Sequence, residues 1–203
     1  MKEPWFKDPL LLRSIPLSAR PSAQQPMKVL NPPEICTSTR LIQDTNWHVA
    51  DSPEIYVEGD LVQIPYRIHY SWPDQEVRSQ LTPDEQLVLA CWMTRHHDGR
   101  VRQEALSLVF ASEVPWTIPF LVQLCGEYVI EVGEDVYAFL NCDLPERPGL
   151  QQAYKQFVNG NPEFFSLTEQ RAMSYWLDDY QTKMPQDNYP QLAALKLLAQ
   201  FLP

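Results

Sequence analysis

Between residues 61 and 70 the hydrophobic pattern has a period of two. Apolar or aromatic side chains occupy every even position of this stretch, and most odd positions are polar. This alternation is typical of a strand with one buried face. The preceding Glu58-Gly59 predicts a tight turn back to residues 55–57, so we expect a β-hairpin at about residues 54–70. Because Pro65 cannot donate to a strand ladder, the hairpin should lie at an edge.

After residue 80 the apolar positions recur at helical spacing. The first helix has a strong start signal, since Thr82 suits the N-cap, Pro83 the first helical position, and Asp84 and Glu85 the first turn. Further helices are expected at about residues 100–112, 118–140, 150–158, 167–182 and 190–202. The long apolar run over 118–140 predicts one central helix. The pattern therefore indicates a mainly α fold.

Residues 1–33 have a different composition from the rest of the chain. They hold seven of its nineteen prolines. Such a segment is typical of an extended, polyproline-like arm. We therefore divide the chain into a Pro-rich extended arm at 1–33 and a single helical domain at 34–203 that contains the hairpin. We expect the arm to dock on its own domain, on a second copy in a homo-oligomer, or on a partner protein.

The net charge of −10 is unevenly distributed. The arm holds five basic residues against two acidic ones, so it is +3 and the remainder is −13. Between Arg102 and Arg147 eight acidic residues occur and no lysine or arginine. An acidic body repels phosphate backbones, which argues against nucleic-acid binding. It suits a protein partner with a basic surface.

The chain carries no signal for secretion, membrane insertion or a bound cofactor. No apolar run approaches the roughly 18 residues that a membrane span requires. The four cysteines are dispersed without CxxC spacing, which predicts reduced thiols rather than a zinc site or a disulfide framework. Glycines never cluster into a phosphate-binding loop. We therefore expect a cytoplasmic protein with no cofactor and no membrane partner.

The polar segment TRHHDGRVRQEAL joins the first two expected helices. Its Asp98, Val101, Arg102 and Ala105 resemble the pattern of one HEAT-type helical repeat over residues 81–112. The resemblance implies that Asp98 caps the second helix, that Arg102 bridges to a turn aspartate, and that the small alanine lets two helices approach. It implies a compact bundle of HEAT-like antiparallel helical hairpins, in which Asp98 and Arg102 are structural turn residues.

The same segment permits an alternative interpretation as a metal site. His69 followed by His97 and Asp98 resembles the spaced pattern of HD-type metal-dependent phosphohydrolases. In that family's pattern a later aspartate, here Asp178 or Asp179, completes the ligand set. Imidazole and carboxylate ligands suit a divalent ion that activates water. Against this, His69 lies in a strand pattern, whereas the family's first histidine lies on a helix.

Candidate partner-binding residues are aromatic side chains in loops and carboxylates on a helix. The tryptophans that lie beside prolines or in loops are Trp5, Trp47, Trp72 and Trp116. The carboxylates of the expected central helix are Glu127, Glu131, Glu134 and Asp135. Large aromatics anchor protein interfaces, and exposed acids attract basic partners. We interpret the chain as a non-enzymatic intracellular protein-binding module. An inhibitor or immunity-type protein for a basic partner is one concrete form of it.

Overall fold

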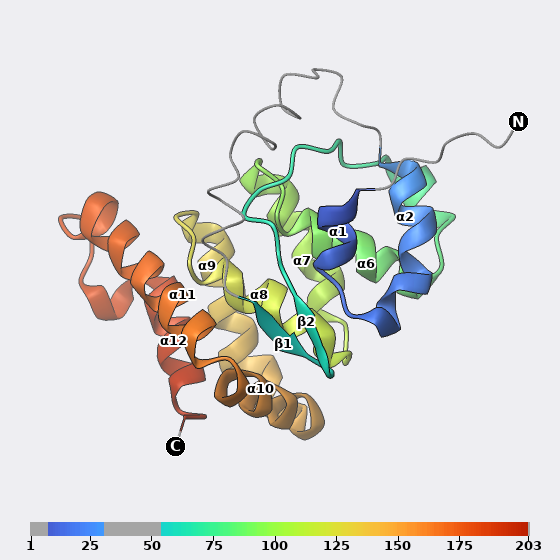
Figure 1. Ribbon diagram of the computed structural model, residues 1–203. Coiled ribbons are helices and arrows are strands. Elements are labelled where there is room, and N and C mark those ends of the chain that lie inside the picture. Colours follow the sequence, from blue (N-terminus) through green and yellow to red (C-terminus); the bar gives the residue numbers. More distant parts are fainter. Residues whose placement is uncertain (1–7, 31–53, 203) are drawn as a thin grey trace, which may run out of the picture. The chain divides into compact units, whose positions relative to one another are not determined.

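The structure, a computed structural model, describes residues 8–30 and 54–202. It is mainly α-helical with one small two-stranded antiparallel sheet, which confirms the expected fold class (Figure 1). Contacts divide the chain into two compact units. Unit 1 comprises Met1–Glu54 and Gly59–Val109, and unit 2 comprises Ile55–Glu58 and Phe110–Pro203. Within the described ranges, no helix combines the length and the apolar character that crossing a membrane would require.

The predicted hairpin is present, but its strands are short. β1 (Ile55–Val57) and β2 (Asp60–Val62) pair across a two-residue turn. Both turn residues have positive φ, 51° at Glu58 and 92° at Gly59, which matches the twist of the flanking strands. Beyond β2 the ladder stops, yet most even positions up to residue 70 remain buried, as the alternation predicts.

Unit 1 is organised around helix α6, whose C-terminal half is buried. Besides β2, its elements are α1 (Pro9–Arg13), η1 (Leu17–Ala23), α2 (Gln24–Val29), α5 (Gln75–Ser79), α6 (Pro83–Met93) and α7 (Gly99–Phe110), which runs to the border of the unit. At the predicted start of α6, the Thr82 N–H donates to the Glu85 carboxylate at 2.8 Å. The Thr82 hydroxyl accepts from the Glu85 N–H at 3.4 Å, completing a capping box.

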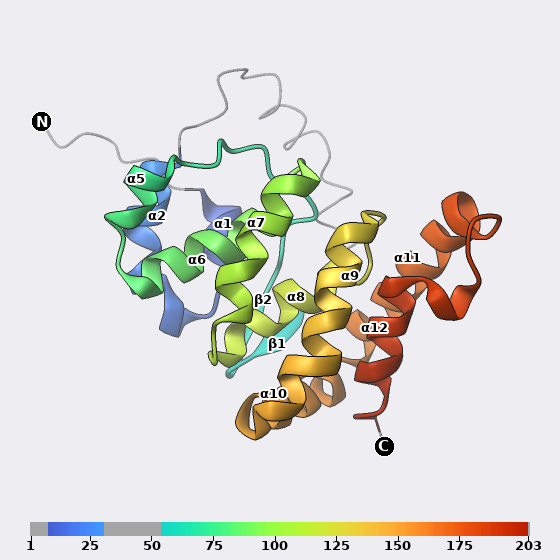
Figure 2. The same ribbon diagram turned by 180° about the vertical axis from the view of Figure 1, so that it is seen from behind.

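The extended conformation expected for the N-terminal arm is wrong for its described residues. Residues 9–29 are almost entirely helical, and η1 and α2 pack on α6 (Figures 1 and 2). Pro9 occupies the first turn of α1, where its missing N–H costs nothing, and the Asp8 carboxylate caps that turn. The segment docks through its own apolar side chains; Leu11, Ile15 and Met27 are at most 1% exposed. Burial against α6 thus overrides the proline-rich composition.

Unit 2 is a helical assembly in which α9 and α12 lie side by side (Figures 1 and 2). Besides β1, its elements are η2 (Pro115–Thr117), α8 (Ile118–Leu124), α9 (Ile130–Ala138), the π-helical η3 (Phe139–Asp143), η4 (Leu144–Glu146), α10 (Pro148–Gly160), α11 (Pro162–Tyr175), the π-helical η5 (Trp176–Tyr180), η6 (Gln186–Asn188) and α12 (Pro190–Ala199). The helices predicted near 150–158, 167–182 and 190–202 are confirmed by α10, α11 with η5, and α12.

The single central helix predicted over 118–140 is wrong, because the chain breaks between α8 and α9. Three carbonyls in this break accept side-chain hydrogen bonds from later residues: Glu127 O from the Tyr189 hydroxyl (3.2 Å), Tyr128 O from the Tyr180 hydroxyl (3.0 Å) and Val129 O from the Gln191 amide (2.8 Å). These bonds replace those that a continuous helix would make. The break therefore depends on tertiary partners that the local hydrophobic pattern does not reveal.

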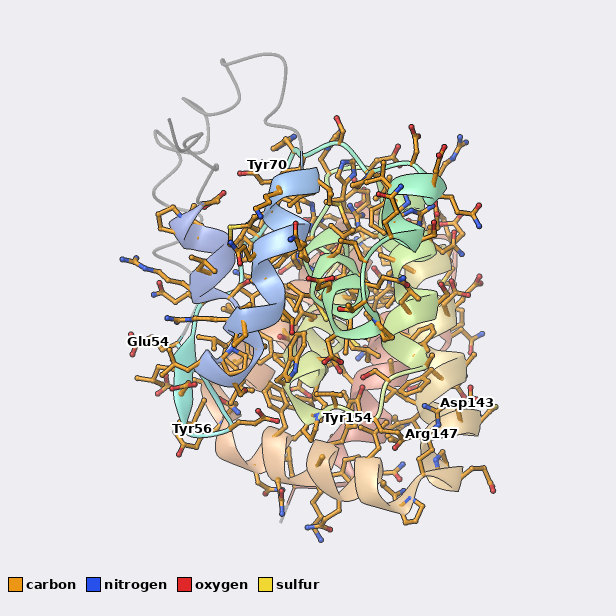
Figure 3. The ribbon with its side chains drawn as sticks, turned by 90° about the vertical axis from the view of Figure 1, so that its right-hand side faces the viewer. Glu54, Tyr56, Tyr70, Asp143, Arg147 and Tyr154 are labelled. Carbon is orange, nitrogen blue, oxygen red and sulfur yellow. The ribbon has the colours of Figure 1, made fainter. Side chains whose placement is uncertain are left out.

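Arg147, labelled in Figure 3, lies at the start of α10. Its guanidinium donates to the Phe110 carbonyl at 2.6 Å and pairs with Glu113 at 3.5 Å. It also lies 5.6 Å from the ring centre of Phe139. Arg147, the first basic residue after the stretch without lysine or arginine, thus has interaction partners within unit 2.

Candidate functional site

Three histidine rings come together in unit 1. The His97 ring stacks on His69 with ring centroids 4.7 Å apart and is tilted against His96 with centroids 4.3 Å apart. His96 is buried, and its two ring nitrogens contact the Tyr70 carbonyl at 2.8 Å and the Asp98 N–H at 3.0 Å. Since an N–H must donate to Nδ1, the neutral ring carries its proton on Nε2. His96 therefore holds the residue 70 segment against the end of α6.

The surroundings of His96 and His69 disfavour the protonated form of each ring. Burial, and then the nearby His97, lower the pKa of His96, although its hydrogen bonds oppose the shift. Burial, followed by His97 and Arg67, lowers the pKa of His69. Neutral imidazoles can bind metal ions, but the described residues contain no group of three or more His, Cys, Asp or Glu side chains that could hold one. The structure thus brings His69 and His97 together without a complete ligand set around them.

Asp98 and Arg102 both act on the backbone of the turn. The Asp98 carboxylate accepts from the Arg100 N–H at 2.9 Å, at the start of α7. The Arg102 side chain is fully buried, and its guanidinium donates to the carbonyls of His96 (2.7 Å) and His97 (3.1 Å). The resemblance implied a turn aspartate as the partner of Arg102, whereas these two bonds go to carbonyls. They satisfy carbonyls of the turn between α6 and α7, which make no bond within either helix.

The candidate tryptophans have different environments. Trp5 and Trp47 lie outside the described residues. Trp72 is partly exposed and lies under the Arg78 guanidinium, 4.2 Å from its ring centre, and Arg78 pairs with Glu104 at 2.8 Å. The Trp72 indole and then Arg78 hold the pKa of Glu104 below its usual value, although burial opposes them. A partner contact by Trp72 therefore stays a prediction.

The surface positions expected for Trp116 and Glu127 are wrong. Trp116 is only 7% exposed and packs edge-on against Phe120, with 6.4 Å between their ring centres. Glu127 is 0% exposed, because it falls in the break between α8 and α9 rather than on a helix face. Neither side chain can contact a partner in this conformation. The error for Glu127 follows directly from the error in the predicted helix.

The remaining predicted carboxylates lie on or beside the outer face of α9. Glu131 and Glu134 are exposed and Asp135 is partly buried. Two tyrosines that we did not predict extend the same surface, Tyr128 at 44% exposed and Tyr137 at 36%. The sequence did carry a signal for them, since positions 128, 131, 134 and 137 recur every three residues as Tyr, Glu, Glu, Tyr. We call these four side chains the acidic tyrosine surface.

A cluster of aromatic side chains supports one end of this surface. Tyr128 contacts Tyr175 with ring centres 5.7 Å apart, and Tyr180 contacts Tyr189 at 5.2 Å. Burial, followed by the charges of Asp179 and Glu131, raises the pKa of Tyr180. Asp179 therefore adds a further carboxylate beside Glu131. The cluster holds Tyr128 in a defined position, which reduces the entropy that it would lose in a complex.

Comparisons with known proteins identify no relative: no protein-family model, no curated protein and no solved structure matches the chain. Function must therefore be argued from the surfaces and side chains themselves.

Proposed function

We propose that this protein binds a basic protein partner through the acidic tyrosine surface. The observation that carries the proposal is the pair of exposed tyrosines, Tyr128 and Tyr137, which flank the exposed Glu131 and Glu134 in unit 2. Tyrosine supplies a large, amphipathic contact at low entropic cost, and the carboxylates select for cations. Inhibition of a basic enzyme or toxin is one form that such binding takes.

The chemistry of the surface favours lysine or arginine side chains in the partner. A cation over a tyrosine face gains roughly 0.5–1 kcal/mol at exposed sites and more when it is desolvated. Unit 2 already shows this geometry internally, because the Lys183 ammonium lies 4.9 Å from the ring centre of Tyr180. The surrounding stretch from residue 103 to 146 contributes no competing cation from its own sequence. A basic partner can therefore contact both tyrosine rings and carboxylates on this surface.

The decisive experiment compares what wild type and surface variants capture from extracts of the source organism. The test variants are Tyr128→Ala/Tyr137→Ala and Glu131→Gln/Glu134→Gln. The matched control is Tyr56→Ala/Glu163→Gln, which removes an exposed tyrosine and an exposed carboxylate of unit 2 outside the surface. Captured proteins are quantified by mass spectrometry, then purified, and their dissociation constants are measured at several salt concentrations.

We expect at least one protein that wild type and control retain and the tyrosine variant loses. Its affinity should fall at least tenfold in the tyrosine variant, as for interface anchors, and about two- to fivefold in the carboxylate variant, as for exposed ion pairs. Affinity should also fall with added salt. Equal capture by the wild type, the control and both test variants would contradict the proposal.

The HEAT-like arrangement remains part of the proposal as a local hypothesis. It is supported by two helices, α6 and α7, that flank a turn in which Asp98 caps the second of them. The metal-dependent phosphohydrolase remains the alternative, favoured only by the contact between His69 and His97. Metal analysis of protein purified without chelator distinguishes the two functions, since stoichiometric metal that is lost in His97→Ala would favour the hydrolase.

A further inference from the structure

A groove of about 800 Å³ lies between α11 and α12 in unit 2. Met173 from α11 and Leu192 and Leu195 from α12 contribute its apolar lining. Its polar margin includes Glu169, Asp187 and Lys196, all of which are exposed. The groove is thus open to solvent along charged side chains. Its lining shares no residue with the acidic tyrosine surface.

The charges of the groove are not balanced. Lys196 lies 3.5 Å from the Asp187 carboxylate, so this cation already has an anionic partner. Among the described residues, the Glu169 carboxylate has no hydrogen-bond or ion-pair partner. Burial alone accounts for the raised pKa of its carboxyl group. A carboxylate that is partly desolvated and unpaired at the margin of an apolar groove is complementary to a cation.

We propose that this groove binds a short amphipathic helix of another protein, which places apolar side chains on Leu192 and Met173 and a lysine or arginine on Glu169. The ten residues of α12 span about 15 Å, which matches roughly three turns of a docked helix. Helix-in-groove recognition uses apolar anchors at i, i+3, i+4 and i+7, flanked by charge. Enclosed clefts favour small ligands, whereas an open groove with a charged margin favours a peptide segment.

The test selects peptides from a 12-residue random library displayed on phage, using the folded full-length protein. Selection on wild type is followed by counter-selection on Leu192→Asp, which places a charge on the groove floor. An enriched peptide is then synthesised with a fluorophore, and its dissociation constant is measured by fluorescence anisotropy. The matched controls are Leu61→Asp, at an exposed leucine of unit 1, and Glu163→Gln, at an exposed carboxylate outside the groove. Circular dichroism verifies that each variant is folded.

We expect selected peptides to combine spaced apolar residues with lysine or arginine. Binding should weaken at least tenfold in Leu192→Asp, about two- to fivefold in Glu169→Gln and further in Glu169→Lys, with both controls within about twofold of wild type. Tyr128→Ala should leave peptide binding unchanged, so the groove and the acidic tyrosine surface are tested separately.

Several results would overturn the proposal. One is a selection that yields no peptide dependent on Leu192, and another is a peptide whose affinity is unaffected by Glu169→Gln. Light scattering of the wild type adds a third, because a dimer that dissociates in Leu192→Asp would assign the groove to a second copy of this chain.

Discussion

The polar turn illustrates how single residues serve the fold rather than a reaction. Three of its side chains support backbone: Asp98 caps α7, Arg102 binds two carbonyls, and His96 holds the Tyr70 carbonyl. Arg95 adds to this set, because its buried guanidinium donates to the Pro65 and Tyr66 carbonyls at 3.1 and 2.8 Å. A dense run of charged and imidazole side chains therefore fastens an irregular segment to α6.

The imidazoles of the buried His96 and the partly buried His69 make the stability of the fold dependent on pH. Burial and His97 lower the pKa of His96 and His69 in the folded protein, whereas an unfolded histidine titrates near 6.5. Above that pH both states are neutral and the histidines contribute no dependence. As pH falls below it, the unfolded state binds protons first, so the free energy of unfolding decreases until the folded pKa is passed.

We predict that His96→Gln weakens this pH dependence. Glutamine can still accept from Asp98 N–H and donate to Tyr70 O, but it does not titrate. Urea unfolding at pH 7.5 and 5.5 should show a smaller loss of stability in the variant than in wild type. Carboxylates titrate in both proteins, so the difference between them isolates the histidine. An NMR titration midpoint for His96 at or above 6.5 would refute the prediction.

Asn161 shows what the sequence leaves hidden at the residue scale. Its buried side chain accepts from the Tyr56 N–H at 2.6 Å and donates to the Tyr56 carbonyl at 3.0 Å, which closes the outer edge of β1. In the sequence, Asn161 before a proline indicates only a turn. Its partner lies 105 positions away. By contrast, the roles of Thr82 and Asp98 were predictable because each acts within three residues of itself.

At the scale of elements, the packing of α9 against α12 depends on the absence of a side chain at Gly133. A Cβ added at Gly133 would lie 2.4 Å from the Gln191 Cδ, and Gln191 is itself buried and bonded to the Val129 carbonyl. The glycine weakens α9 as a helix by roughly 1 kcal/mol relative to alanine. Close packing and the bond to Val129 offset that cost.

Gly133→Ala should therefore destabilise the protein by about 1–3 kcal/mol, despite the better helix propensity of alanine. In a Gln191→Ala background the same change should cost much less, because the clashing side chain is gone. Gly149→Ala in α10 is the matched control; its Cβ meets nothing within 4 Å, so we expect no loss. Urea unfolding of the four-member cycle measures the coupling. Strictly additive costs would show that Gln191 is not the obstacle.

Local sequence signals predicted elements well and their interruptions poorly. The period-two and helical patterns identified the hairpin and most helices, since those signals reside in neighbouring residues. The break between α8 and α9 was missed because it is stabilised by Tyr180, Tyr189 and Gln191, more than fifty positions later. Because of that error, Glu127 was expected at the surface although it is buried. Of the predicted carboxylates, only Glu131 and Glu134 are exposed.

At the scale of the whole chain, the N-terminal segment belongs to the core of unit 1. The Trp92 indole donates to the Ser14 hydroxyl at 3.1 Å. The side chains of Ile15 and Leu30 are at most 1% exposed. The opposite charges of the arm and the body also suggested, as a weaker possibility, that the arm of one copy docks on the body of the next. In the structure, residues 8–30 dock on their own chain by burying apolar side chains. Burial of apolar surface generally stabilises such packing more than attraction between exposed charges does.

We predict that Ile15→Ala lowers the free energy of unfolding by about 2–5 kcal/mol, the usual cost of truncating a fully buried side chain. Leu17→Ala, only two residues later but 59% exposed, should change it by no more than about 0.5 kcal/mol. Because the segment docks within its own chain, the melting temperature of wild type should not depend on protein concentration. Docking between copies requires a melting temperature that rises with concentration and an Ile15→Ala variant that dissociates before it unfolds. Thermal unfolding over a hundredfold concentration range, combined with light scattering, therefore separates the two arrangements.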